Sequence, residues 1–306
     1  MQNISHYIKR PNSIVIAIFT RTCKWLPDRL YLQLLFFLHF GRFINLKNPK
    51  TFSEKLQWLK LYNRRPEYTQ LVDKYAVKQY VANKIGEEHI IPTISVWNRP
   101  EDIDFDKLPN SFVLKTTHSC GGVGVVICKD KRKLNIKDAI KKLNNSLKTD
   151  LSKSMREWPY KNVPHKIIAE KYIEDESREP KDYKFFCFDG NPLYCQVIRN
   201  RFIKETIDFY DSDWNHMPFT GLNPNVGNGL NHVVKPLCLE DLINKCQKLS
   251  AGIPFVRIDF YIIDNCYYFG EMTFYPASGL GCFRPKEWNY KFGDWLNLPS
   301  PIISAK

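Results

Sequence analysis

The first third of the chain carries apolar residues at the spacing typical of amphipathic helices. Three stretches fit this spacing: 26–40, 51–63 and 67–86. Thr51 or Ser53 suits the N-cap of the second stretch, and Gly86 suits the end of the third. The pattern therefore predicts a mainly helical N-terminal region.

Beyond residue 89 the pattern changes to short apolar runs typical of strands. A first group of runs covers 89–97, 111–117, 123–129 and 165–173, with a polar helical segment at 135–150. A second group covers 182–201, 206–211, 256–263 and 267–274, separated by turn residues and a helix at 239–251. Such an arrangement predicts an α+β fold whose second part is an antiparallel sheet.

Length and cysteine content narrow the class of protein. With 306 residues and 43% hydrophobic content, the chain is long for one compact domain, so two or three subdomains are expected. Its nine cysteines include no C-x-x-C pair, which argues against a disulfide framework and a structural zinc site. The apolar runs 13–19 and 30–40 are too short for a signal sequence or a membrane span, so a cytoplasmic protein is expected.

Charge is concentrated in the N-terminal third. Residues 1–100 contain 16 Lys and Arg but 6 Asp and Glu. The remaining residues contain 29 Lys and Arg and 26 Asp and Glu. The basic, aromatic region is either a solvated helix face or a surface for an anionic membrane or an acidic substrate. No nucleic-acid-binding signature is present, so nucleic acid is not expected as a partner.

Two acids interrupt the apolar runs of residues 257–279. Asp259 and Glu271 become cross-strand neighbours if a bulge or an odd-numbered turn, such as a three-residue turn at 264–266, closes the hairpin. With that turn, Arg257, Asp259 and Tyr261 would share a face with Tyr267, Phe269, Glu271 and Thr273. Carboxylates about 5 Å apart repel by about 3 kcal/mol, so a proton or a cation is expected between them, and a hard divalent cation fits best. Mg²⁺ suits such ligands; the alternative is two acids that face water.

A glycine-rich turn follows a strand that carries a lysine. The stretch 112–128 places Lys115 before Gly121, Gly122 and Gly124. Glycines let backbone N–H groups approach an anion, so this turn predicts a phosphate cradle, with a merely flexible hairpin as the alternative. His118 beside the turn is expected to be structural or solvated, with a phosphate contact as the alternative. Cys120 has no nearby base in the sequence and is expected to be unreactive.

The order of these motifs resembles the ATP-grasp superfamily. Its elements are a D-K lysine, a strand lysine with a glycine loop, a strand ending in E-K-Y-I, an R-x-D and a late E-x-T followed by P-A-S-G. The stretches "LKNPKTFSEKLQWLKLY", "DKYAVKQYV", "LKTTHSCGGVGV" and "DYKFFCFDGNP" are similar to the TupA-like branch, which is named for teichuronopeptide biosynthesis. The resemblance covers roughly residues 25–295. It implies a helical region at 1–88, a small ATP-grasp subdomain at 89–168 and a larger one at 169–306.

The resemblance also implies roles for individual residues. Lys74 and Lys115 would bind the phosphates of ATP, with Gly121, Gly122 and Gly124 over them. The adenine site would be lined by Glu170, Lys171 and Ile173. Asp182 or Glu174 would contact the ribose. Asp259 and Glu271 would hold Mg²⁺, and Arg257 would stabilise an acyl phosphate, unless it only pairs with Asp259. Thr273 stands where many members have Asn.

Two functions compete at this stage. The first is an ATP-dependent carboxylate–amine ligase, for which the resemblance implies a uronic acid of a bacterial surface polysaccharide and an amine or amino acid. Such an enzyme would be cytoplasmic, at the inner face of the membrane if the basic region binds it. The second is a glycosyltransferase of the same pathway, for which "DSD" at 211–213 offers a nucleotide-sugar motif.

Overall fold

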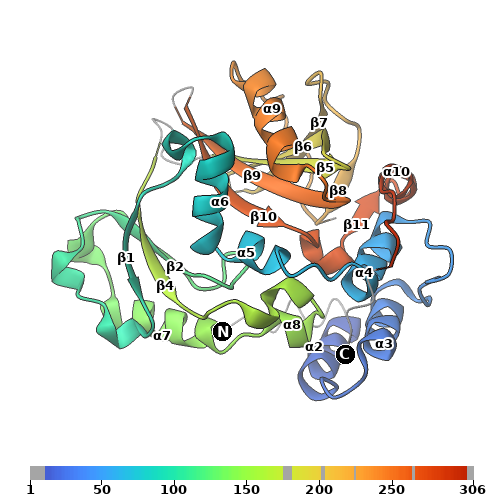
Figure 1. Ribbon diagram of the computed structural model, residues 1–306, viewed down its shortest axis with the longest axis horizontal. Coiled ribbons are helices and arrows are strands. Elements are labelled where there is room, and N and C mark those ends of the chain that lie inside the picture. Colours follow the sequence, from blue (N-terminus) through green and yellow to red (C-terminus); the bar gives the residue numbers. More distant parts are fainter. Residues whose placement is uncertain (1–10, 175–180, 201–203, 224, 264–265, 302–306) are drawn as a thin grey trace.

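The computed structural model describes residues 11–174, 181–200, 204–223, 225–263 and 266–301, and Figure 1 shows their arrangement. Its α-helices are α2 (Pro11–Thr22), α3 (Asp28–Phe40), α4 (Phe52–Tyr62), α5 (Tyr68–Val72), α6 (Ala76–Ile85), α7 (Ile136–Leu147), α8 (Leu151–Ser154), α9 (Leu239–Ser250) and α10 (Glu287–Trp295). Its strands are β1 (Thr93–Trp97), β2 (Phe112–Thr116), β3 (Val125–Cys128), β4 (Ile167–Lys171), β5 (Asp182–Phe188), β6 (Asn191–Arg199), β7 (Thr206–Asp211), β8 (Thr220–Leu222), β9 (Phe255–Ile263), β10 (Cys266–Thr273) and β11 (Cys282–Arg284).

Two antiparallel sheets form the framework. The first has the order β1-β4-β2-β3 and the second the order β10-β9-β5-β6-β7. Figure 1 shows the first sheet on the left and the second at the centre and right, with α5 and α6 near the middle. The predicted α+β class and the antiparallel second sheet are confirmed.

Each sheet buries one face beneath a helix. In β9, Val256, Ile258 and Phe260 are buried in the core that also takes up α9, because alternate side chains of a strand point to one face. The intervening residues of β9 are left on the opposite face. In the first sheet, α7 buries Ala139 and Leu143 against the strands.

Helix α4 begins where the sequence indicated. Thr51 accepts a hydrogen bond from the backbone N–H of Glu54, and the Glu54 carboxylate accepts one from the backbone N–H of Thr51. This reciprocal capping box makes Thr51, not Ser53, the N-cap. Helix α4 packs in the same core as the second sheet, whereas α2 and α3 form a smaller core of their own.

Two expectations about local structure were wrong. The predicted helix 67–86 is two helices, because Asp73 interrupts it and accepts hydrogen bonds from the N–H groups of Tyr75 and Ala76. This break places Lys74 immediately before α6.

The second correction concerns the β9–β10 hairpin. Cys266 pairs with Ile263, which rules out a three-residue turn at 264–266, and residues 264–265 lie outside the described part. A bulge at Gly270 supplies the extra residue and brings Glu271 opposite Asp259. Because the bulge comes after them, Tyr267 and Phe269 lie on the buried face rather than beside Glu271.

Candidate active site

A cavity of about 540 Å³ lies between the two sheets. This volume is in the range of small-molecule sites. Residues of the first sheet and its loops face residues of β5, β9 and β10 across it. The cavity brings together eleven of the twelve residues predicted for the site, namely Lys74, Lys115, Gly121, Gly122, Glu170, Lys171, Ile173, Asp182, Arg257, Asp259 and Glu271.

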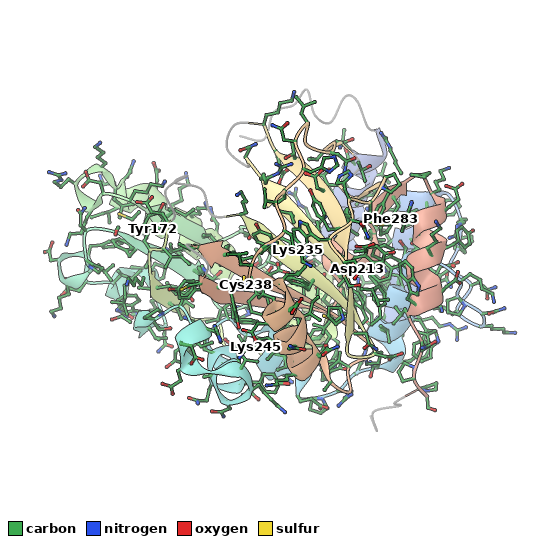
Figure 2. The ribbon with its side chains drawn as sticks, turned by 90° about the horizontal axis from the view of Figure 1, so that it is seen from above. Tyr172, Asp213, Lys235, Cys238, Lys245 and Phe283 are labelled. Atoms are coloured by element: carbon green, nitrogen blue, oxygen red, sulfur yellow. The ribbon has the colours of Figure 1, made fainter. Side chains whose placement is uncertain are left out.

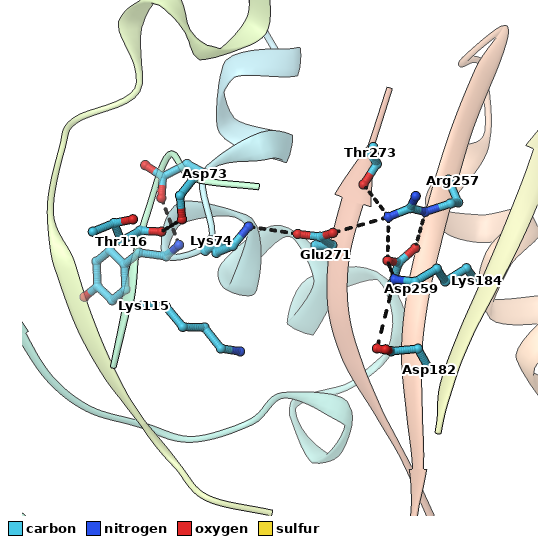
Figure 3. Close-up of polar contacts among 12 residues, drawn as sticks. Asp73, Lys74, Lys115, Thr116, Asp182, Lys184, Arg257, Asp259, Glu271 and Thr273 are labelled. Carbon is cyan, nitrogen blue, oxygen red and sulfur yellow. Dashed lines mark hydrogen bonds and ion pairs between the residues drawn. The ribbon is translucent and has the colours of Figure 1, made fainter. Parts of the chain in front are cut away.

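Positively and negatively charged side chains alternate in a row along one side of this cavity (Figure 3). Arg257 donates two 2.7 Å hydrogen bonds to the Asp259 carboxylate, from Nε and from Nη2. Its Nη2 also lies 3.3 Å from Glu271 Oε1 and donates to the Thr273 hydroxyl at 3.1 Å. Arg257 therefore does not pair with Asp259 alone, and Thr273 helps to hold the guanidinium in place.

The two acids of this row differ in exposure. The Asp259 side chain is 4% exposed, and the Glu271 side chain is 27% exposed. Lys74 Nζ lies 2.8 Å from Glu271 Oε2. Burial disfavours the charged form of Glu271, but Lys74, Lys184 and Arg257 outweigh it and lower the pKa of this carboxyl. Glu271 is thus an ionised carboxylate that the cavity can reach.

Lys184 of β5 completes the row. Its ammonium group contacts Asp259 and lies 4.0 Å from Asp182. Strand pairing places Lys184 directly opposite Asp259. The buried Asp259 is therefore held between two cations, and Asp182 lines the cavity beside them.

A second charged cluster lies on the first sheet. Glu170 of β4 is buried, and its two carboxylate oxygens contact Lys115 at 2.5 Å and Lys78 at 2.6 Å. Burial disfavours the charged form of Glu170, but the two lysines outweigh it and lower the pKa of the carboxyl. Glu170 therefore positions Lys115 at the cavity wall.

The glycine turn lies between β2 and β3. Gly121 and Gly122 line the cavity with φ of +61° and +76°, and a Cβ on either would meet no protein atom within 4 Å. Gly124 is different, because its Cβ would lie 2.2 Å from Ser146 Oγ. It does not line the main cavity but packs against α7, so its predicted place over the phosphates is not where the structure puts it. The backbone N–H of Lys74 donates to Thr117 and ties the Lys74 loop to this turn.

The end of β4 supplies the remaining wall. Lys171, Tyr172 and Ile173 line the cavity in succession. Glu174 does not line it; this residue accepts a hydrogen bond from the Tyr172 hydroxyl and lies 3.5 Å from Lys129. Of the two ribose candidates, Asp182 is the one that faces the cavity.

The donor set of the acid pair fits Mg²⁺. Asp259 and Glu271 are direct cross-strand partners and offer only oxygen atoms. In the described part of the chain, no group of three or more His, Cys, Asp or Glu residues could hold a metal. A magnesium ion usually takes one or two carboxylates and completes its shell with water and phosphate oxygens. The two acids would hold it in exchange for part of their contacts with Arg257, Lys184 and Lys74.

Another group of buried polar residues lies at the wall formed by Glu157, Tyr160 and Ser278. The Ser278 hydroxyl donates to Glu157, and Lys60 Nζ donates to the Ser278 carbonyl at 2.8 Å. Burial raises the pKa of Glu157 and lowers that of Lys60 to about 8.

Burial, with the nearby Glu157 and Glu271, raises the pKa of the Cys120 thiol to about 12. That thiol is protonated at neutral pH, as the sequence led us to expect.

His118 is structural. Its ring stacks on His165 with centroids 3.6 Å apart, its Nε2 donates to the Ser146 carbonyl, and it does not line the cavity. Burial and His165 lower the pKa of His118 from 6.5 to about 4.

This shift predicts acid sensitivity. Between pH 6.5 and 4 the unfolded chain binds more protons than the folded chain, so the free energy of unfolding should fall as the pH falls. The loss should be about 3 kcal/mol over that window. Urea unfolding at several pH values measures it. His118→Gln should flatten this dependence, and the exposed His232→Gln should not; equal slopes in all three proteins would contradict the assignment.

Sequence reasoning missed four of the charged or polar residues at this site. Lys78 stands four residues after Lys74, and Lys184 stands two residues after Asp182 in a strand, so both could have been found from periodicity. Glu157 and Ser278 lie outside regular α-helix and strand. Ser278 belongs to the P-A-S-G motif, to which no individual role was given, and no sequence pattern pointed to Glu157.

The "DSD" motif lies elsewhere. Asp211 ends β7 and accepts hydrogen bonds from the N–H groups of Asp213 and Asn215, which closes a turn. Neither Asp211 nor Asp213 lines the main cavity. Figure 2 shows Asp213 well apart from Tyr172, which lines the cavity wall.

Comparisons with known proteins identify the family of this chain. The TupA-like ATP-grasp family matches residues 54–297. No curated protein matches the chain. Similar solved structures include D-alanine–D-alanine ligase from Bacillus anthracis complexed with ATP (18% identity, TM-score 0.38, 67% of this chain and 53% of that one). The D-alanine–D-alanine ligase from Helicobacter pylori is also similar (16% identity, TM-score 0.41, 74% of this chain and 61% of that one). So is the ATP-grasp ligase PsnB complexed with its minimal precursor (12% identity, TM-score 0.39, 72% of this chain and 60% of that one).

The chain therefore spans between about half and three fifths of the length of these ligases. Their identities are below 20% and their TM-scores below 0.5, so no property of these ligases is assigned to this chain. The family match covers most of the sequence and includes the lysines, the glycine turn and the acid pair that line the cavity. The chain belongs to the TupA-like ATP-grasp family.

Proposed function

We propose that this protein is an ATP-dependent carboxylate–amine ligase that works through an acyl phosphate. The carboxylate would be a uronic acid of a bacterial surface polysaccharide, and the amine an amino acid or another primary amine. The observation that carries this proposal is the arrangement of Arg257 with Asp259 and Glu271, which faces Lys74, Lys115 and the glycine turn across one cavity. Because the proposed reaction consumes ATP, it would take place in the cytoplasm.

The chain's own residues have distinct tasks in this reaction. Lys74 and Lys115 bind phosphate oxygens, and the N–H groups of Gly121 and Gly122 lie over them. The ends of β4 and β5 hold the nucleoside, with Lys171 and Ile173 at the adenine and Asp182 at the ribose. Asp259 and Glu271 would hold Mg²⁺, which neutralises charge on the transferred phosphoryl group.

Activation begins when a carboxylate oxygen of the uronic acid attacks the γ-phosphorus and ADP leaves. Arg257 is fixed by Asp259 and Thr273, so its guanidinium can stabilise the negative charge of the acyl phosphate without reorganising. The amine then attacks the carbonyl carbon, phosphate leaves, and the amine loses a proton. Glu157 lines the same cavity, and its raised pKa suits it to accept that proton.

A glycosyltransferase is the competing function. Its nucleotide-sugar motif would be "DSD", whose carboxylate at Asp211 is engaged in its own turn, outside the main cavity. Product analysis separates the two functions. With a panel of uronates and amines, we expect ADP and phosphate but neither AMP nor UDP. Release of UDP from a nucleotide sugar without ATP consumption would instead establish the transferase.

The strand lysine offers a test of nucleotide binding. Lys115→Ala should weaken ATP binding by about 1.5 to 3 kcal/mol, the value of a charge-assisted contact. Isothermal titration calorimetry measures this difference. The exposed Lys141→Ala on α7 is the matched control and should bind ATP normally. Unchanged affinity in Lys115→Ala would show that the glycine hairpin is only structural.

A further inference from the structure

Helix α2 is apolar on two opposite faces. Ile16 and Phe19 pack against the small core that α3 contributes to. Ile14 and Ile18 lie on the other side of the helix and are 47% and 58% exposed, and Val15 on its flank is 49% exposed. A surface helix usually exposes a polar face, so this second apolar face indicates a contact surface.

Further apolar side chains extend this exposure into α3 and the turns beside it. Trp25 is 78% exposed, Leu30 and Phe37 lie seven residues apart on α3, and Phe43 stacks on Phe37. In the described part of the chain, seven of the sixteen exposed large hydrophobic residues lie between residues 14 and 43. We call this set the N-terminal apolar surface: Ile14, Val15, Ile18, Trp25, Leu30, Phe37 and Phe43.

The charge around this surface identifies its partner. Residues 11–50 contain six Lys and Arg and one acid, Asp28. Asp28 is already paired, with Arg64 and with Arg156. Arg21 stands seven residues after Ile14 and three after Ile18, so it continues the same exposed stripe of α2. Arg42 pairs with Glu54, and the remaining basic residues still outnumber the acid. Apolar residues bordered by an excess of basic residues are typical of helices that lie in the surface of an anionic bilayer.

The surface is firmly attached to the rest of the protein. Arg156 donates 2.8 Å hydrogen bonds to the carbonyls of Lys24 and Leu26 and lies over the Tyr31 ring. The Tyr31 hydroxyl donates to the Ser154 carbonyl. The neighbouring residue Glu157 lines the cavity. The α2–α3 hairpin is therefore anchored to the segment that forms one end of the active site.

We propose that the N-terminal apolar surface docks this protein peripherally on an anionic lipid membrane. No helix in the described residues is long and apolar enough to cross a bilayer, so the contact is with the lipid surface. A second copy of the chain is a poorer occupant, because it would bring two basic surfaces together.

Co-sedimentation with vesicles tests this proposal independently of any ligase activity. The probes are vesicles of equal parts phosphatidylglycerol and phosphatidylcholine, and vesicles of phosphatidylcholine alone. The full chain should bind the anionic vesicles at low salt and be released at about 0.5 M salt, where charges are screened over a few ångströms. Binding to both vesicles alike, or to neither, would overturn the proposal.

Matched variants locate the surface. Arg21→Glu with Lys24→Glu should lower the partition coefficient at least about tenfold. Lys137→Glu with Lys141→Glu changes the net charge equally on the exposed face of α7 and should leave binding nearly unchanged. Ile18→Asp should also reduce binding, whereas Val234→Asp, at an 86% exposed position, should not. Equal losses in test and control variants, or a self-association that Ile18→Asp abolishes without vesicle binding, would overturn the assignment.

Discussion

Glu271→Gln should lower kcat by about a thousandfold while the protein stays folded. The substitution removes the charge of a cavity-facing carboxylate that we propose as a ligand of Mg²⁺, and a bound metal contributes several kcal/mol to stabilising the transition state. Because the Glu271 side chain is 27% exposed but pairs with Lys74 and Arg257, its loss should lower the melting temperature, though by less than the loss of the buried Asp259. Steady-state kinetics at saturating Mg²⁺, with thermal denaturation alongside, measures both effects. Glu240→Gln, an exposed acid on α9, is the control.

Asp259→Asn should behave differently, although both acids belong to the proposed metal site. Asp259 is buried between Arg257 and Lys184, and breaking a buried pair typically costs about 3 to 5 kcal/mol. This variant should therefore lose stability as well as turnover. Normal activity in both variants at ordinary Mg²⁺ concentrations would remove the metal-site assignment.

Arg257→Met should reduce kcat by about a hundredfold to a thousandfold and leave ATP affinity close to that of the wild type. In the proposed reaction the guanidinium stabilises charge on the acyl phosphate, which forms together with ADP, so its loss should slow the chemical step rather than weaken nucleotide binding. Rapid-quench measurement of ADP formation, with separate ATP titration, distinguishes the two steps. Arg257→Lys keeps the positive charge but loses the planar guanidinium that donates to Asp259 and Thr273 together. This variant should therefore have part of the rate that Arg257→Met loses. An equal loss in ATP affinity and in rate would assign Arg257 to nucleotide binding instead.

The sequence predicted those parts of the site that regular secondary structure controls. Alternation along β9 placed Arg257 and Asp259 on one face, and the cavity lies on that face. The cross-strand pairing of Asp259 with Glu271 was also foreseen, although its cause was a bulge at Gly270 instead of a three-residue turn. A bulge and an added turn residue shift the register equally, so the sequence pattern does not distinguish them.

Long-range contacts explain what the sequence did not predict. Lys60, Glu157 and Ser278 come from three segments far apart in the chain, and they meet only because α4 packs beside the loop after β10. The same holds for Gly124, whose close approach to Ser146 depends on where α7 lies on the first sheet. Such contacts follow from tertiary packing and leave no local period in the sequence.

The division at residues 88 and 168 stays a prediction. Helix α4 shares a core with the second sheet, and β4 of the first sheet continues to Lys171. The structure therefore ties the helical region to the larger sheet more closely than its sequence pattern suggested.

Transfer of oxygen from the carboxylate to phosphate tests the central claim most directly. A uronate substrate labelled with ¹⁸O in its carboxylate is incubated with ATP, Mg²⁺ and hydroxylamine, a small nucleophile that replaces the unknown amine. If an acyl phosphate forms, one labelled oxygen passes to the released phosphate, and the uronate becomes a hydroxamate. The account predicts labelled phosphate equal in amount to ADP and hydroxamate, with none formed by Glu271→Gln on the same timescale. Hydroxamate accompanied by unlabelled phosphate, or by AMP, would contradict it.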